Sequence, residues 1–321
     1  MNCNDIWYDH FIETLYERYP QRPQLTQALT ELLFIEREAV YRRLRKDVVF
    51  PAHEIMKIAS AWNISLDEIT GISNDHVPFL MRPVNYINPS DKELNRLYQL
   101  IQFLGQLKDS PDSEYMEIGN KLPRSLFAGF EQIHRFYLFK WMYQYGGEDK
   151  IIPFSKIGIS EKKLRLTSAY YYAMKNVANV SYIWDQMLFE YLACDIRYFY
   201  SIQLITDKDK ERIKRDLYNL LDYMSEVAAK GSFPETNNKV NLYISRINID
   251  TNYSYIYTNE LKAGHIHAFG KHEVCTSDAD MIENIRTWLQ LKKRSSGQIS
   301  ETNEKQRIEY FMKQRQLITE L

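Results

Sequence analysis

Cysteine, glycine and proline are all scarce in this chain of 321 residues. Its three cysteines have no regular spacing, which argues against a disulfide framework or a zinc ribbon and favours a reducing compartment. Eleven glycines and ten prolines are few for this length and favour long helices over an all-β chain. No apolar run approaches a membrane span, and the N-terminus lacks the basic and then apolar order of a signal peptide. We therefore expect a cytoplasmic, mostly helical protein that does not contact membranes.

An excess of charge of one sign is also lacking. Lysine and arginine total 41 against 42 aspartates and glutamates, which gives a formal net charge of −1. A nucleic-acid footprint would therefore have to be a local basic patch. The length allows more than one hydrophobic core, so two or three domains are expected.

Catalytic motifs are missing as well. The chain has no phosphate-cradling glycine loop, no nucleophile elbow and no HExxH helix. The sequence accordingly offers no catalytic residues, and we expect neither an enzyme nor a cofactor.

A small helical bundle is predicted between Gln24 and Gly71. Within it, a second helix runs from about Glu36 to Lys46 with Val40 and Leu44 pointing inward. The third helix carries an apolar stripe at i, i+3, i+4 and i+7 that must be buried against the other two. That stripe consists of Ile55, Ile58, Ala59 and Trp62. An amphipathic helix over Asp5 to Tyr19 is expected to pack with them.

The segments LTELLFIEREAVYRRLR and HEIMKIASAWNISLDEI resemble the lambda-repressor and Cro type of helix-turn-helix domain, a family of bacterial and phage transcription regulators. The resemblance covers roughly the first quarter of the chain. It implies sequence-specific binding to double-stranded DNA, usually as a homodimer on a two-fold-related site. This chain departs from the family pattern in the turn, where Phe34 replaces the usual glycine. It departs again after the recognition helix, where Lys46 and Asp47 stand in place of glycine.

One face of the predicted recognition helix is basic. With Val40 and Leu44 inward, the expected DNA-binding residues are Arg37, Glu38, Tyr41, Arg42, Arg45 and Lys46. Arginine suits both phosphate contact and bidentate recognition of guanine in the major groove. The alternative is a solvated basic face without a partner.

The rest of the chain is predicted as three parts. Residues 73–110 form a linker and a connecting helix, in which Leu94, Leu97, Ile101 and Leu104 follow 3-4-3 spacing. This stripe fits either a helix docked on its own domain or a short self-association surface. Residues 111–231 are predicted as a helical domain, including one long helical region over Ser160 to Ile205. Residues 232–321 are predicted as a small α+β domain, because VNLYISRINI, NYSYIYT and HIHAFG are rich in β-branched and aromatic residues.

The expected fold is therefore mainly α, with an N-terminal helix-turn-helix bundle over residues 1–72, a helical middle domain and a small C-terminal α+β domain. Two clusters in the C-terminal part could bind ligands. His265, His267, His272 and Cys275 suggest a metal site, but no acidic residue or second cysteine completes the spacing, so we expect no metal. A basic cluster would suit a small anionic effector, and a solvated face is its alternative. It comprises Lys292, Lys293, Arg294, Lys305 and Arg307.

Taken together, these features predict a one-component transcription regulator that binds DNA as a homodimer, with a C-terminal region for effector sensing or dimerisation. The alternative from another class is an interaction or scaffold protein whose helical bundle binds protein rather than DNA. Loss of binding between low and moderate salt would distinguish the two, because phosphate contacts release counterions.

Overall fold

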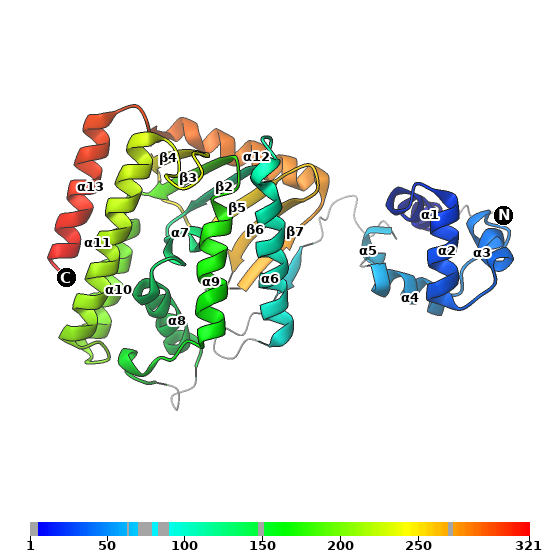
Figure 1. Cartoon of the computed structure of the whole chain (residues 1–321), viewed down its shortest axis with the longest axis horizontal. Helices are drawn as coiled ribbons and strands as arrows, with labels where there is room; N and C mark the ends of the chain where they lie inside the picture. Colours follow the sequence, from blue (N-terminus) through cyan, green and yellow to red (C-terminus); the bar gives the residue numbers. More distant parts are fainter. Residues whose placement is uncertain (1–5, 63, 70–78, 83–89, 147–150, 269–271) are drawn as a thin grey trace. The chain divides into compact units, whose positions relative to one another are not determined.

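The computed structural model describes the chain except residues 1–5, 63, 70–78, 83–89, 147–150 and 269–271 (Figure 1). The chain divides into two compact units, Met1–Pro78 and Phe79–Leu321. We call them the N-terminal unit and the C-terminal unit.

The N-terminal unit contains five helices in the described residues. They are α1 (Ile6–Arg18), α2 (Arg22–Leu33), α3 (Arg37–Leu44), α4 (Ala52–Trp62) and α5 (Leu66–Ile69). Their apolar faces meet in one core, in which Phe11, Leu15, Leu25, Leu29, Val40 and Ile58 are fully buried. The helices predicted over residues 24–71 are present, and the apolar stripe of α4 faces this core.

Phe34 makes the turn between α2 and α3. Its backbone adopts the left-handed conformation, with φ of 58° and ψ of 41°, and its N–H donates to the carbonyl of Thr30. A non-glycine residue in this conformation costs roughly 1–2 kcal/mol. The side chain is 86% exposed, and the ammonium of Lys57 lies 4.8 Å from its ring centroid. The turn geometry thus accommodates Phe34 without burying it.

The C-terminal unit combines one sheet with helices on both faces. Its first half contains β1 (Leu80–Arg82), α6 (Asp91–Gln106), β2 (Glu114–Gly119), α7 (Arg124–Phe127), α8 (Glu131–Tyr145), α9 (Glu161–Met174), β3 (Asn179–Asp185), α10 (Leu188–Ser201) and α11 (Asp207–Lys230). Its second half contains β4 (Lys239–Ser245), β5 (Tyr253–Tyr257), β6 (Lys262–Ala268), β7 (His272–Thr276), α12 (Ala279–Lys292), β8 (Ser296–Gln298) and α13 (Glu304–Thr319). Short 3₁₀ turns occur at Leu107–Asp109, Phe154–Lys156 and Lys293–Ser295.

The eight strands follow the order β1-β7-β6-β5-β2-β3-β4-β8. The central β2, β3 and β4 are parallel to one another, and every other neighbouring pair is antiparallel. Parallel neighbours need long crossover connections, which α7 to α9 and α10 to α11 supply. The main core lies between one face of the sheet and helices α6 to α11 and α13. Helix α12 packs on the opposite face over a second, smaller core (Figure 1).

The predicted fold class is therefore wrong. The protein has an α/β fold with a large mixed sheet, and residues 111–231 and 232–321 both contribute strands to that sheet. The region predicted as one helix over Ser160 to Ile205 contains α9, β3 and α10. Strand β3 is buried on both faces, because helices cover both sides of the sheet at this position. Such a strand shows no alternation of polar and apolar residues and cannot be told from a buried helix by pattern alone.

Helix α6 begins with a capping box, in which Ser90 and Glu93 bond each other's backbone N–H groups. It packs against α9, and Leu104 is fully buried while Ile101 is partly buried against the main core. Of the two interpretations of the leucine stripe, docking within its own unit is the one that this packing favours.

Candidate nucleic-acid interface

Helix α3 is held by two residues on its inner face, Val40 and Leu44, which are 0% and 6% exposed. The six predicted DNA-binding residues are all exposed to solvent. Arg37, Glu38, Tyr41 and Arg42 lie on the helix. Arg45 follows as its C-cap, and Lys46 continues in the left-handed conformation with φ of 66°.

The charges on this surface are not equivalent. Arg45 lies 3.3 Å from both Glu38 and Asp47, and Lys46 forms an ion pair with Asp9. These pairs are well exposed and stabilise the fold little. Arg37 and Arg42 form no ion pair with any residue that the structure describes. They are therefore the two arginines of α3 whose guanidinium groups need no rearrangement to bind an anion.

Arg43, by contrast, points into the bundle. Its Nε lies 2.7 Å from Oε2 of Glu54, and its Nη2 donates to Oε1 of the same carboxylate at 2.9 Å. The two side chains are only 15% and 8% exposed. The guanidinium also donates to the carbonyl of Ala39 and lies 5.7 Å from the ring centroid of Phe50. This buried pair joins α3 to α4 and was not predicted from the sequence.

A signal for the role of Arg43 was present. It follows Val40 by three residues and precedes Leu44, which places it on the inner side of α3. Glu54, its partner, lies in the first turn of α4, next to buried Ile55. The exposed face of α3 is thus held in place by an arginine that does not belong to it.

The predicted effector cluster near the C-terminus has a different character. Arg307 is 8% exposed, and its Nη1 donates to the carbonyls of Ile299 and Thr302 at 3.2 and 3.5 Å. This arginine supports the start of α13. Lys292 and Lys293 lie over the rings of Trp288 and Tyr243, at 4.8 and 5.5 Å from the centroids.

Lys305 and Arg294 complete that cluster, and both are exposed. Lys305 lies 3.9 Å from Glu309. Burial lowers the pKa of the Lys293 ammonium. The cluster therefore consists of two lysines over aromatic rings, an arginine bound to backbone carbonyls and two exposed residues. These five side chains do not converge on one anion site.

The histidine motif lies on β6 and β7. Register pairs His265 with Cys275 and His267 with Glu273 across the two strands. In the part of the chain that the structure describes, no group of three or more histidine, cysteine, aspartate or glutamate side chains could hold a metal ion. The side chain of His272 lies outside the described residues.

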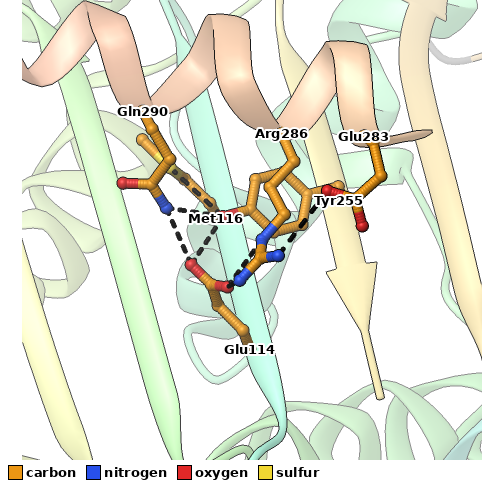
Figure 2. Close-up of polar contacts among 6 residues, drawn as sticks. All are labelled: Glu114, Met116, Tyr255, Glu283, Arg286 and Gln290. Carbon is orange, nitrogen blue, oxygen red and sulfur yellow. Dashed lines mark hydrogen bonds and ion pairs between the residues drawn. The ribbon is translucent and has the colours of Figure 1, made fainter. Parts of the chain in front are cut away.

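A second polar network, not predicted from the sequence, fastens α12 to the sheet. Figure 2 shows Arg286 and Gln290 reaching from α12 to Glu114 on β2. Nε and Nη2 of Arg286 donate to Oε2 of Glu114 at 3.1 and 2.9 Å, and Gln290 donates to Oε1 at 2.8 Å. The hydroxyl of Tyr255, a fully buried residue of β5, donates to the same Oε1 at 2.6 Å. Glu114 thus accepts four hydrogen bonds from three side chains, which come from two elements.

We expect Arg286→Met to lower the free energy of unfolding by about 1–3 kcal/mol, because it leaves a largely buried carboxylate without its charged donor. Urea denaturation of the full-length protein measures this effect. Glu283→Gln is the matched control, since Glu283 is a more exposed and more distant partner of Arg286 at 3.7 Å. Equal stability losses for the two variants would contradict the role assigned to the Glu114 network.

Lys163 is a buried lysine on α9, with 8% of its surface exposed. Burial, followed by the nearby charge of Arg124, lowers the pKa of its ammonium to about 8. Since the ordinary lysine pKa is near 10.5, the unfolded chain binds more protons than the native one between about pH 8 and pH 10.5. Folding stability contributed by this group therefore rises with pH across that window.

Lys163→Met is accordingly expected to stabilise the protein at pH 7 and to flatten the pH dependence of unfolding between pH 8 and 10.5. The lowered pKa of Lys163 corresponds to roughly 3 kcal/mol of folding free energy. Chemical denaturation at a series of pH values tests it, with the exposed neighbour Lys162→Met as control. A pH slope that persists in Lys163→Met would assign the titration to another group.

Comparison with protein-family models, with curated proteins and with solved structures finds no match for this chain. Among the described helices, none is both long and apolar enough to cross a membrane.

Proposed function

We propose that the protein is a cytoplasmic transcription regulator that binds double-stranded DNA in a sequence-specific manner, with α3 as the recognition helix. The observation that carries this proposal is the exposed arginine face of α3, on which Arg37 and Arg42 have no ion pair with a described residue. The inner face of the helix is held against the bundle by Val40, Leu44 and the Arg43–Glu54 pair. A basic face on a rigidly supported helix is the arrangement that helix-turn-helix proteins use.

The dimensions of α3 suit this role. Its eight residues span about 12 Å at 1.5 Å per residue, and the major groove of B-DNA is about 12 Å wide. Arg42 could then reach base edges, where arginine pairs with O6 and N7 of guanine. The DNA phosphates would be contacted by Arg37, at the start of the helix, and by Tyr41, which is 40% exposed.

The C-terminal unit is then the regulatory part, as a sensing domain, a dimerisation domain or both. A small anionic effector is proposed to bind near Lys293, because burial lowers the pKa of its ammonium and a bound anion would raise that pKa and stabilise the charged form. An effector bound to the C-terminal unit would change DNA affinity only if it changed the fraction of dimers or the fraction of protein in a conformation that can bind DNA.

The alternative function is a scaffold whose α3 face binds an acidic protein surface. The same exposed arginines would serve either role. What separates the two is stoichiometric counterion release, which makes DNA affinity fall steeply and linearly with the logarithm of salt concentration.

The test starts from full-length protein and a library of random duplexes, followed by sequencing of the bound fraction. We expect one enriched motif, and binding to that duplex should weaken by orders of magnitude between 50 and 200 mM salt, as expected for several phosphate contacts. A scrambled duplex of equal composition is the control. Absence of any enriched motif, with no salt-dependent binding, would overturn the proposal in favour of a protein partner.

A further inference from the structure

Phe34 combines two features that work against the stability of the N-terminal unit. Its backbone has a φ of 58°, in the left-handed region that glycine adopts freely and a residue with a Cβ atom does not. Its side chain is 86% exposed, the largest value among the exposed large hydrophobic side chains that the structure describes. The fold therefore gains little from the ring and would accept glycine at this position with less strain.

The other described residues with positive φ, apart from glycine, all have polar side chains. They are Lys46, Gln203, Asn237, Glu301 and Asn303. Among the described residues, Phe34 is thus the one apolar side chain held in this conformation, and it is presented to solvent rather than to a core. Backbone strain of this kind persists mainly at sites where the strained residue serves a function.

Lys57 accompanies Phe34 on the surface of the bundle. Its ammonium lies 4.8 Å from the centroid of the Phe34 ring. It is an exposed residue of α4 and forms no ion pair with any residue that the structure describes. A cation over an aromatic ring keeps its full charge and can still bind an anion. Together the two side chains form an exposed surface that is apolar on one side and cationic on the other, which we call the Phe34–Lys57 pair.

The position of this pair beside α3 indicates what it binds. Phe34 lies two residues before Glu36, the N-cap of α3. Helix α3 is about as long as the major groove is wide, so residues just beyond its ends meet the walls of the groove. Each wall is a chain of deoxyribose rings and phosphates, in which an apolar sugar face alternates with an anion. The Phe34–Lys57 pair is complementary to that alternation in both polarity and charge.

We propose that the Phe34–Lys57 pair binds the sugar–phosphate backbone at the edge of the groove. The Phe34 ring lies against a deoxyribose, and the Lys57 ammonium binds a neighbouring phosphate. This contact rests on the proposed function, because it requires α3 to lie in the major groove. Contacts with the DNA backbone position a protein and carry no sequence information, so the pair orients α3 without selecting bases.

Replacement of Phe34 separates DNA binding from folding. In the full-length protein, we expect Phe34→Gly to raise the melting temperature of the N-terminal unit by roughly 4–8 °C, because the left-handed turn is no longer strained. The same variant should bind the selected duplex about tenfold more weakly, since it loses an aromatic contact. Phe34→Ala keeps the strain and should lose the same affinity without the gain in melting temperature. A lower melting temperature for Phe34→Gly would give the ring a folding role and overturn the strain argument.

Lys57→Met tests the phosphate contact. For this variant we expect the slope of log affinity against log salt concentration to be smaller by about one than for wild type, with the selected and the scrambled duplex alike. Fluorescence anisotropy at a series of salt concentrations measures the slope. Met56→Ala is the matched control, because Met56 precedes Lys57 on α4 and is 55% exposed. It should leave both the affinity and the slope unchanged, and a loss equal to that of Phe34→Ala would overturn the assignment to the Phe34–Lys57 pair.

The possible results distinguish this contact from the proposed function. Wild-type affinity and salt slope in both Phe34→Ala and Lys57→Met would overturn the contact while DNA binding through α3 stands. A loss in Phe34→Ala that is confined to the selected duplex would assign the ring to base recognition and overturn the backbone contact. Absence of duplex binding by the wild-type protein would overturn both proposals in favour of a protein partner.

Discussion

Replacing Arg37 and Arg42 together by alanine is expected to weaken binding to a selected duplex by about 2–6 kcal/mol, at about 1–3 kcal/mol for each arginine that contacts DNA well. The reason is that both side chains are exposed on α3 and engaged by no described acidic residue, so their full interaction is available to the duplex. The melting temperature should stay unchanged, because neither side chain supports the bundle. Fluorescence anisotropy with the selected and the scrambled duplex measures the loss.

Two controls sharpen this experiment. Arg45→Ala should cost less, since Glu38 and Asp47 already neutralise part of its charge. Arg18→Ala removes an exposed arginine from α1 and should leave affinity nearly unchanged. The single variants also separate two modes of contact. Loss at Arg42 that depends on duplex sequence indicates a base contact, whereas a uniform loss with a smaller salt slope indicates a phosphate contact. Normal affinity in the double variant would mean that α3 is not the recognition helix.

The N-terminal helices were predictable because the contacts that define them are local. Each helix carries its own apolar stripe, and Val40 with Leu44 fixes which side of α3 faces solvent. The same pattern placed all six predicted residues on the surface. The pattern did not show which of the six side chains form ion pairs, because Asp9 lies on α1 and Asp47 lies in the turn after α3.

The sheet was not predictable to the same degree. Strand β2 has the sequence EYMEIG, whose two glutamates indicate a solvated break rather than the centre of a sheet. Their partners lie far along the chain, with Arg286 172 residues from Glu114 and Asn252 135 residues from Glu117. Patterns within a short window do not include such partners. The three segments predicted as strands between residues 240 and 270 contain parts of β4, β5 and β6, but the sheet they enter is built around β2 and β3.

The second large effect concerns the support of α3. Glu54→Ala is expected to lower the free energy of unfolding of the N-terminal unit by about 3–5 kcal/mol, because it leaves the guanidinium of Arg43 buried without its carboxylate. A unit of this size has a total stability of roughly 4–12 kcal/mol, at about 0.05–0.15 kcal/mol per residue. The variant should therefore lose a large fraction of this unit's stability and unfold it at a lower temperature, while the C-terminal unit keeps its own stability, since the two are separate compact units.

Scanning calorimetry of the full chain would detect this as a selective loss or downward shift of one of two transitions. Glu38→Ala is the matched control: it breaks an ion pair on the same helix, but its side chain is 72% exposed and the expected cost is below about 0.5 kcal/mol. Arg43→Met combined with Glu54→Leu should restore most of the stability, because a buried ion pair is replaced without great cost by apolar residues of similar volume. With the helix restored and Arg37, Arg42 and Arg45 intact, that double variant should also bind the selected duplex. Equal stability of Glu54→Ala and Glu38→Ala would show that the Arg43–Glu54 pair does not hold α3, and restored folding without restored binding would give Arg43 a direct role in DNA recognition.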